Sequence, residues 1–216
     1  MYASLQSLHR GVALRSGPLL RYPADVAPFC AVAEASADIS DAVADLLAPG
    51  ESTYMLGVAP TSIRGARLEA FPKLAQMVCD VPLAEVDGPQ IIPLGEAHRR
   101  DVLALTALVY PHYFRPRTMD LGRYFGIYES GRLAAMIGER LGTDDTREIS
   151  AVCTHPDFTG RGLARRLMAM LTNDLLALGK QPFLHVSHEN TRAKAMYLQL
   201  GFRVRIDIPF HGHHRD

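Results

Sequence analysis

The sequence has no net charge, little cysteine and no long apolar run. Its 23 Lys and Arg residues balance 23 Asp and Glu residues. Nothing therefore indicates non-specific binding to nucleic acid or to an anionic membrane surface. No apolar run approaches the ~20 residues that a membrane-spanning helix needs. We expect neither a nucleic acid nor a membrane as a partner.

The three cysteines, Cys30, Cys79 and Cys153, are odd in number and widely spaced. They form neither a zinc pattern nor a disulfide framework, which fits a reducing compartment and predicts no metal site. The first 24 residues contain three arginines and no acid, a composition faintly like that of a transit peptide. That stretch continues without a break into the next one, so we expect a polar N-terminus in a cytoplasmic protein.

At 216 residues the chain is longer than one typical domain of ~100–150 residues and shorter than two. Pro82, Gly88, Pro89 and Pro93 lie close together, and such a cluster commonly marks a boundary. We predict an irregular N-terminal half over residues 1–88 and a second domain over residues 89–216. Neither repeats nor low-complexity segments occur.

Few elements can be predicted in the first half. Residues 38–47 have helical spacing of apolar side chains, with Asp38 or Ser40 as a cap. Residues 52–59 favour a strand, and residues 72–78, "PKLAQMV", favour a short helix.

The pattern is clearer after residue 88. It predicts, in order, a strand at 90–94, a helix at 96–109, a loop at 110–118, strands at 122–129, 132–141 and 147–154, a helix from 163 to about 178, a strand at 182–187, a helix at 190–200 and a strand at 202–210. Ser130-Gly131 predicts a hairpin turn, and Gly179 and Gly201 end helices. This order predicts a mixed α/β (α+β) fold.

The stretch "THPDFTGRGLARRL", residues 154–167, places two glycines where a strand gives way to a helix. A helix N-terminus offers unpaired N–H groups and partial positive charge, and it therefore suits a phosphate. Gly160 and Gly162 would let a phosphate approach the backbone, and Arg161, Arg165 and Arg166 add positive charge. The pattern indicates a pyrophosphate site, although a plain turn with solvated arginines fits the glycines as well.

Two familiar phosphate motifs are excluded at this turn. A P-loop needs a lysine after its second glycine, and no lysine follows either glycine here. A dinucleotide fingerprint needs a third small residue for close packing of helix on strand, and Arg165 occupies that position.

Residues 90–210 resemble the GNAT superfamily of N-acetyltransferases. The family's turn, Q/R-x-x-G-x-G/A, is matched by Gly160 and Gly162, while Asp157 departs from the usual Gln or Arg. A second signature, N-x-x-A-x-x-x-Y-x-x-x-G-F, is met in full by Asn190, Ala193, Tyr197, Gly201 and Phe202. The irregular first half most resembles the glycine N-acyltransferase-like branch.

This resemblance implies a central, mostly antiparallel sheet flanked by helices, with an additional N-terminal α/β half. The family core usually ends in two strands after the last helix, and only one is predicted here. The N-terminal half could complete the sheet, or the last strand could be absent.

The resemblance also implies acetyl-CoA as co-substrate, without a metal. The residues that would hold acetyl-CoA are Val152, Cys153, Thr154, Thr159, Gly160, Arg161, Gly162, Leu163, Ala164, Arg165, Asn190 and Tyr197. The backbone of residues 152–154 would pair with pantetheine, and the turn would hold the pyrophosphate. Cys153 is expected to be a packed thiol, since His155 lies ~6.6 Å along the strand, too far to activate it.

Two catalytic residues are predicted. By alternation, Glu148 shares a strand face with Ser150, Val152 and Thr154, where related enzymes carry a glutamate that accepts the amine proton. Pairing with Arg140 or Arg147 is the alternative, and Glu139 is the reserve candidate for the base. Tyr197, at the family's tyrosine position, would donate a proton to the departing thiolate.

The acceptor is predicted only by class. The loop residues His112, Tyr113, Phe114, Arg115 and Arg117 would shape its pocket, and the arginines hint at a carboxylate, hence at an amino acid. We expect a small-molecule amine or amino acid as acceptor. His211, His213 and His214 are expected to lie on a polar frayed end and not to bind metal.

Three other readings stay open: a CoA-binding sensor without turnover, a protein N-acetyltransferase, and a nucleotide-binding domain that uses the same helix end. A homodimer is possible.

Overall fold

The computed structural model describes residues 1–61 and 63–216. Up to residue 88 its elements are α1 (Tyr2–Gln6), β1 (Leu14–Ser16), β2 (Leu19–Arg21), β3 (Phe29–Ala31), α2 (Ser40–Leu46), β4 (Ser52–Leu56) and β5 (Ala66–Val78). The remaining elements are β6 (Ile92–Leu94), η1 (Glu96–His98), α3 (Arg99–Val109), η2 (Thr118–Leu121), β7 (Tyr124–Glu129), β8 (Arg132–Gly142), β9 (Thr146–Thr154), η3 (Pro156–Phe158), α4 (Leu163–Ala177), β10 (Gln181–Ser187), α5 (Thr191–Leu200) and β11 (Arg203–Arg215). Among these residues, no helix combines the length and the apolarity that a bilayer crossing requires.

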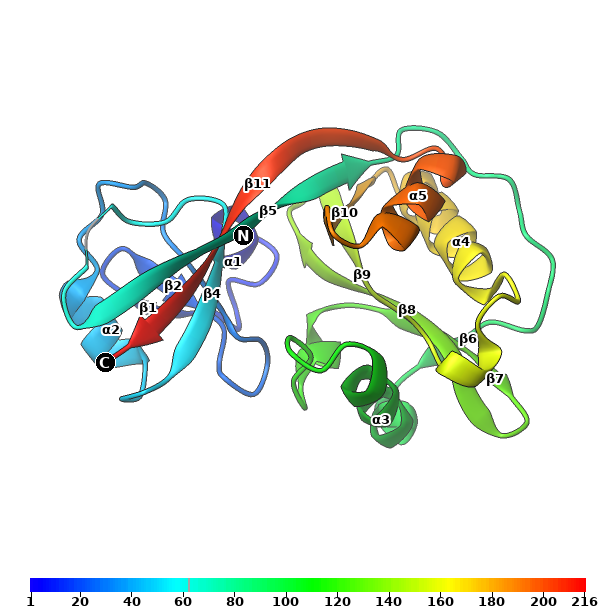
Figure 1. Cartoon of the computed structure of the whole chain (residues 1–216), viewed down its shortest axis with the longest axis horizontal. Helices are drawn as coiled ribbons and strands as arrows, with labels where there is room; N and C mark the ends of the chain where they lie inside the picture. Colours follow the sequence, from blue (N-terminus) through cyan, green and yellow to red (C-terminus); the bar gives the residue numbers. More distant parts are fainter. Residues whose placement is uncertain (62) are drawn as a thin grey trace.

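One mixed sheet runs through both halves, in the order β1-β2-β3-β4-β11-β5-β10-β9-β8-β7-β6. All neighbours are antiparallel except β3 with β4 and β9 with β10. The two long strands β5 and β11 pair with each other and connect the two ends of the molecule (Figure 1). The sequence predicted only one strand after the last helix, where the family core usually has two. β5, which precedes residue 88, lies between β10 and β11, so the N-terminal half completes the sheet.

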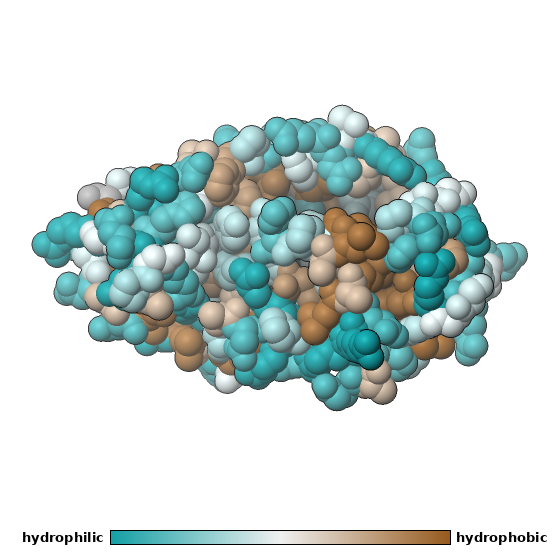
Figure 2. All heavy atoms as spheres, turned by 60° about the horizontal axis from the view of Figure 1, so that its bottom comes forward, coloured by the Kyte–Doolittle hydropathy of each residue, from teal (hydrophilic) through white to brown (hydrophobic). Residues whose placement is uncertain are grey.

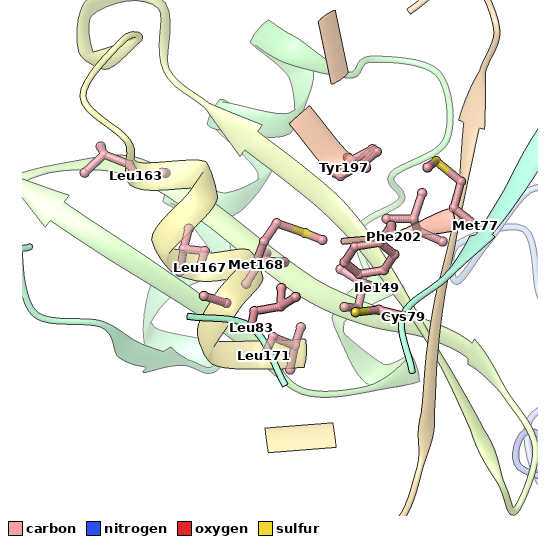
Figure 3. Packing of buried hydrophobic residues seen from close by; sticks show 14 of the residues in the cluster. Met77, Cys79, Leu83, Ile149, Leu163, Leu167, Met168, Leu171, Tyr197 and Phe202 are labelled. Carbon is pink, nitrogen blue, oxygen red and sulfur yellow. The ribbon is translucent and has the colours of Figure 1, made fainter. Parts of the chain in front are cut away.

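Helices cover both faces of the second half of the sheet. The apolar stripe of α4, which includes Leu163, Leu167 and Leu171, packs on one face, and α3 packs on the other through Val102 and Leu105. Figure 3 shows the first of these cores, with the α4 leucines directed toward the sheet. Met77 of β5 and Cys79 just after it also belong to that core, which therefore takes side chains from before residue 88.

Most elements predicted from the sequence are confirmed. The strand at 52–56, the helices α2 to α5, the strands β6 to β10 and the loop after α3 lie where the patterns placed them, within a few residues. At the predicted hairpin, Ser130 and Gly131 both have positive φ, 51° and 73°, as a two-residue turn between strands requires. The α2 helix begins with Ile39 at its N-cap, while the Asp38 carboxylate accepts the Ser40 amide at 3.0 Å.

The predicted short helix at residues 72–78 is wrong, because this segment is the second part of β5. Burial alternates there: Ala75 and Met77 are fully buried and Gln76 is partly exposed. A run of seven mixed apolar and polar residues is compatible with the period of a helix and with that of a strand. Pairing with β10 and β11 makes this segment a strand.

The expected polar frayed end is also wrong. β11 does not stop near residue 210 but continues to Arg215, pairing with β4 on one side and β5 on the other. His213 is fully buried, and its Nδ1 lies 3.1 Å from the Thr53 hydroxyl. The segment "HGHH" looks polar in sequence, but the two flanking strands enclose it.

Candidate active site

A wedge opens between β9 and β10 in the middle of the sheet. The two parallel strands pair only up to Glu148 and Phe183, after which β10 continues on β5 alone. Within the wedge, β9 carries a bulge: its register against β8 shifts after Ser150, and Ala151 has a φ of 51°. This bulge interrupts the strict alternation that placed Glu148 on one face with Val152 and Thr154.

The glycine turn lies after β9, between η3 and α4. Gly160 and Gly162 have φ values of 80° and 77°, in the left-handed region that favours glycine. A Cβ built on either glycine would meet no atom within 4 Å, so both face open space. Gly162 is the N-cap of the 15-residue helix α4, whose first amides are therefore directed at the opening.

A cavity of about 710 Å³ extends from this turn along α5. Its lining includes Thr154, Thr159, Gly160, Arg161, Gly162, Leu163, Ala164, Arg165, Asn190, Arg192, Met196 and Gln199. In Figure 2, hydrophobic side chains gather over the half of the molecule that carries α3 to α5. Exposed apolar residues of that half include Leu108, Val109 and Leu198, and Val109 lines the cavity.

The arginines near the turn have different partners. Arg161 bonds Glu129 at 2.7 Å and lies 5.0 Å over the Phe158 ring, and Arg165 bonds Gln199, so both remain at the cavity rim. Arg166 instead donates to the backbone carbonyls of Val86 and Pro89 and fastens the segment before β6 to α4. It does not line the cavity, contrary to the expectation that it adds charge there.

A second cavity, of about 300 Å³, adjoins the first. Five residues line both cavities: Val109, Val152, Asn190, Ala193 and Tyr197. Tyr197 is 7% exposed, and burial raises the pKa of its phenol, which therefore keeps its proton at neutral pH. Asn190 caps α5 by accepting the Ala193 amide at 3.1 Å, as its position at the helix start predicts.

Glu148 lies on the floor of the smaller cavity in a closed set of hydrogen bonds. Arg140 donates to both carboxylate oxygens, at 2.8 and 2.9 Å, and the Leu141 amide donates at 3.2 Å. His185 Nδ1 lies 2.7 Å from the same carboxylate. Burial alone would raise the pKa of Glu148, but the Arg140 charge and the His185 hydrogen bond outweigh it and hold that pKa well below its usual range.

The tautomer of His185 follows from its neighbours. Gln76 accepts a bond from Arg205 Nε at 2.6 Å on its side-chain oxygen, so its NH₂ group faces His185 Nε2 at 3.0 Å. An amide NH₂ can only donate, which makes Nε2 the acceptor and leaves the proton on Nδ1, directed at Glu148. His185 is thus oriented like the histidine of a carboxylate–imidazole pair.

The other residues predicted from the sequence lie in different places. Cys153 lines the smaller cavity, and burial raises the pKa of its thiol to about 12. Glu139 lines neither cavity; its carboxylate accepts from Arg123 Nε at 2.8 Å. Of the five loop residues predicted to shape the acceptor pocket, Tyr113 lines the smaller cavity, and His112, Phe114, Arg115 and Arg117 do not.

Several lining residues were not predicted. Phe29, Leu56, Leu74, Arg140, His185 and Phe210 line the smaller cavity and come from six different strands. No local pattern in the sequence connects them. In contrast, Arg192, Met196 and Gln199 lie four and three residues apart on α5, and this helical spacing could have placed them together on one face.

No metal centre is found in the described part of the chain, where no three His, Cys, Asp or Glu side chains are placed to hold an ion. The C-terminal histidines have other partners. His213 faces Thr53 and Cys30, and His214 bonds Ser52 at 2.8 Å.

The chain is similar to known proteins in sequence and in fold. Residues 124–209 match the family described as FR47-like protein. A crystallised protein from Novosphingobium aromaticivorans, described as an acetyltransferase from the GNAT family, is 30% identical with a TM-score of 0.89, and the match covers 100% of this chain and 96% of that one. A GCN5-related N-acetyltransferase from Kribbella flavida shares the fold at 17% identity with a TM-score of 0.65, over 99% and 93% of the two chains. No functionally curated protein matches.

Proposed function

Because the chain belongs to the GNAT family of acetyltransferases, we propose that it transfers the acetyl group of acetyl-CoA to a primary amine of a small molecule or amino acid. The observation that carries this proposal is that two cavities meet at Tyr197. One has an open helix N-terminus suited to a diphosphate, and the other is a pocket of a size suited to a small acceptor. The glycine N-acyltransferase-like branch stays a prediction, because the matching family and structures are described in other terms.

The larger cavity fits acetyl-CoA. The amides of Gly160 to Arg165 would hold the diphosphate, Arg165 and Arg192 would add positive charge at the rim, and the β9 backbone at residues 152–154 would accompany the pantetheine arm. The co-substrate would supply an acetyl group activated as a thioester.

Tyr197 would act as the acid. It lies on α5 and lines both cavities, and burial raises the pKa of its phenol, which therefore keeps its proton. A protonated phenol at this junction can give its proton to the thiolate that departs when the amine attacks.

The Glu148–His185 pair would take the proton of the amine. Glu148 is a weak proton acceptor by itself because Arg140 and His185 hold its pKa low. His185 Nε2 carries a lone pair, and Glu148 stabilises the imidazolium that forms when Nε2 accepts a proton. For this proton transfer, the hydrogen bond from the Gln76 amide to His185 Nε2 must break, so that the amine or a water can bind at Nε2.

The volume of the smaller cavity, about 300 Å³, favours a small acceptor over a protein lysine or N-terminus, because it lies within the range of small-molecule pockets. Its walls come from both halves of the chain. We place the reaction in the reducing cytoplasm, which suits the three cysteines, all free and buried.

Calorimetry with acetyl-CoA, CoA, ATP and NAD tests the cofactor, and a screen of amines and amino acids with thiol release as readout tests turnover. We expect binding of the two CoA compounds alone, and thiol release that depends on an added amine. Tight binding of ATP or NAD without CoA would contradict the proposal. CoA binding without release for any amine would favour the sensor reading.

A further inference from the structure

The smaller cavity has an aromatic wall that was assembled from distant segments. Phe29 of β3 stacks on Tyr113 with ring centroids 6.0 Å apart, and Phe210 of β11 meets Tyr113 at 6.2 Å. Tyr110 contacts Tyr113 at 5.2 Å. All four residues line the cavity, together with Leu56 of β4 and Leu74 of β5. Because the rings pack on one another, the wall is ordered before any ligand arrives.

The charges of this cavity are already paired. Among the described residues that line it, the only Arg, Lys, Asp or Glu side chains are Arg140 and Glu148, which bind each other in a bidentate pair. Arg140 also lies 5.0 Å over the Phe29 ring. A ligand carboxylate placed beside this pair would meet the Glu148 carboxylate as well as the arginine, and would lose its hydration without a free cation to replace it.

The loop arginines that hinted at a carboxylate are used elsewhere. Arg117 forms ion pairs with Asp25 and Asp120, at 3.3 and 2.9 Å, and neither it nor Arg115 lines the cavity. The sequence-based reason to expect an amino acid therefore does not apply to this pocket.

We infer that the acceptor is a primary amine attached to an uncharged aromatic group, with its ring against Phe29, Tyr113 and Phe210 and its nitrogen toward the Glu148–His185 pair. This inference rests on the proposed function and narrows its substrate class. The N-terminal half and β11 then determine specificity, because they supply Phe29, Leu56, Leu74 and Phe210. A cavity of about 300 Å³ has room for one ring and a short amine arm.

Three probes test the inference on the full-length protein: 2-phenylethylamine, phenylalanine, which adds a carboxylate to the carbon that carries the amine, and ethylamine, which lacks the ring. Dissociation constants are measured by calorimetry with CoA present, and kcat/KM by thiol release from acetyl-CoA. We expect 2-phenylethylamine to bind and react at least about tenfold better than either other probe, the scale of one well-packed aromatic group. Phenylalanine performing as well would overturn the charge argument, and ethylamine performing as well would overturn the aromatic one.

The two measurements separate this inference from the proposed function. Binding of 2-phenylethylamine without thiol release would support the pocket and contradict the transferase. Release with ethylamine or phenylalanine, but weak binding of 2-phenylethylamine, would support the transferase and overturn the inference.

A matched pair of variants locates the ring. Phe210→Ala removes a lining ring, whereas Phe71→Ala removes a ring that contacts Phe210 at 5.4 Å without lining the cavity. We expect Phe210→Ala to weaken 2-phenylethylamine binding about tenfold with unchanged CoA affinity, and Phe71→Ala to change neither by more than about twofold. Leu74→Trp, which fills the pocket from β5, is the second test and should exclude 2-phenylethylamine while ethylamine still reacts. Equal effects of the two alanine variants, or unhindered binding in Leu74→Trp, would place the ring elsewhere.

Discussion

At the scale of single residues, Tyr197 lines both cavities, and its phenol can donate a proton there. Its ring also packs in the α4 core beside Phe202, at a centroid distance of 6.1 Å (Figure 3). Tyr197→Phe keeps that packing and removes the hydroxyl alone.

We predict that Tyr197→Phe lowers kcat about a hundredfold, the usual contribution of a positioned acid, and leaves the dissociation constant of acetyl-CoA unchanged. Steady-state kinetics with calorimetry on the same preparation measures both. An unchanged kcat would remove the acid role, and parallel loss of CoA affinity would make the tyrosine a binding residue.

The Glu148–His185 pair gives a second prediction at this scale. His185→Gln removes the Nε2 lone pair that would accept the amine proton, so kcat/KM should fall about a hundredfold. Gln76→Ala frees Nε2 without touching the pair, and kcat/KM should then be equal or higher.

Steady-state kinetics distinguishes this role from a structural one. If His185 only filled space, kcat/KM would be nearly unchanged in the glutamine variant. A loss of kcat/KM in Glu148→Gln with none in His185→Gln would return the base role to the glutamate.

At the scale of elements, the turn before α4 depends on Gly160 and Gly162, which both have positive φ. Gly160 and Gly179 share this geometry, at 80° and 68°, and neither has atoms within 4 Å of an added Cβ. Gly179 ends the same helix, where its amide bonds the Leu176 carbonyl at 2.9 Å. The two glycines thus have the same backbone geometry but different places, one at the cavity and one at the far end of α4.

We predict that Gly160→Val and Gly179→Val each lower the free energy of unfolding by about 1–2 kcal/mol, because a β-branched residue is strained at positive φ. Only Gly160→Val should also lose acetyl-CoA binding, by about a hundredfold or more, since its side chain occupies the space through which a phosphate reaches several amides. Urea unfolding and calorimetry provide the comparison. Equal losses of affinity in both variants would show that helix stability, not access to the amides, decides binding.

At the scale of the whole molecule, β11 joins the two halves. Its first residues pair with β5 beside β10, and its last residues pair with both β4 and β5 (Figure 1). His213 is fully buried in this last part, against Thr53 and Cys30, and its Nε2 has no partner in the described part of the chain. Burial, with the nearby charges of His214 and Arg21, lowers the pKa of His213 to about 4.

The lowered pKa of His213 makes the folded protein less stable as the pH falls. Between pH 6.5 and about 4 the unfolded chain protonates this histidine and the folded chain does not, so the free energy of unfolding falls as the pH falls, by about 1.4 kcal/mol per unit. Above pH 6.5 both states are neutral here and the contribution is constant. Urea unfolding between pH 4 and 7.5 measures the slope.

His213→Leu should flatten that slope, because Thr53 and Cys30 retain each other at 3.2 Å while the titrating ring is gone. His112→Gln, at an exposed position, is the control and should keep the slope of the native protein. A slope unchanged in His213→Leu would assign the acid sensitivity to other groups, of which buried His9 is the first candidate because burial lowers its pKa too.

The sequence by itself determined the elements that depend on neighbouring residues. The alternation of β7 to β10, the spacing of leucines along α4, the Ser130-Gly131 turn and the Gly160–Gly162 turn are all local patterns, and each could be read within about twenty residues. The two motifs that contribute to the larger cavity, at residues 157–162 and 190–202, were found for the same reason, since each lies on one continuous segment.

Only the tertiary structure decided the rest. The strand identity of residues 72–78, the burial of His213, the bulge at Ala151 and the pairing of Glu148 with Arg140 and His185 depend on contacts between segments far apart in the chain. The aromatic wall of the smaller cavity is the clearest case, because Phe29, Tyr113 and Phe210 lie far apart in sequence and meet only when β5 and β11 bring the two halves together. Short-range propensities carry no information about such contacts, because the favourable free energy of burying these side chains is gained only when the distant segments pack together.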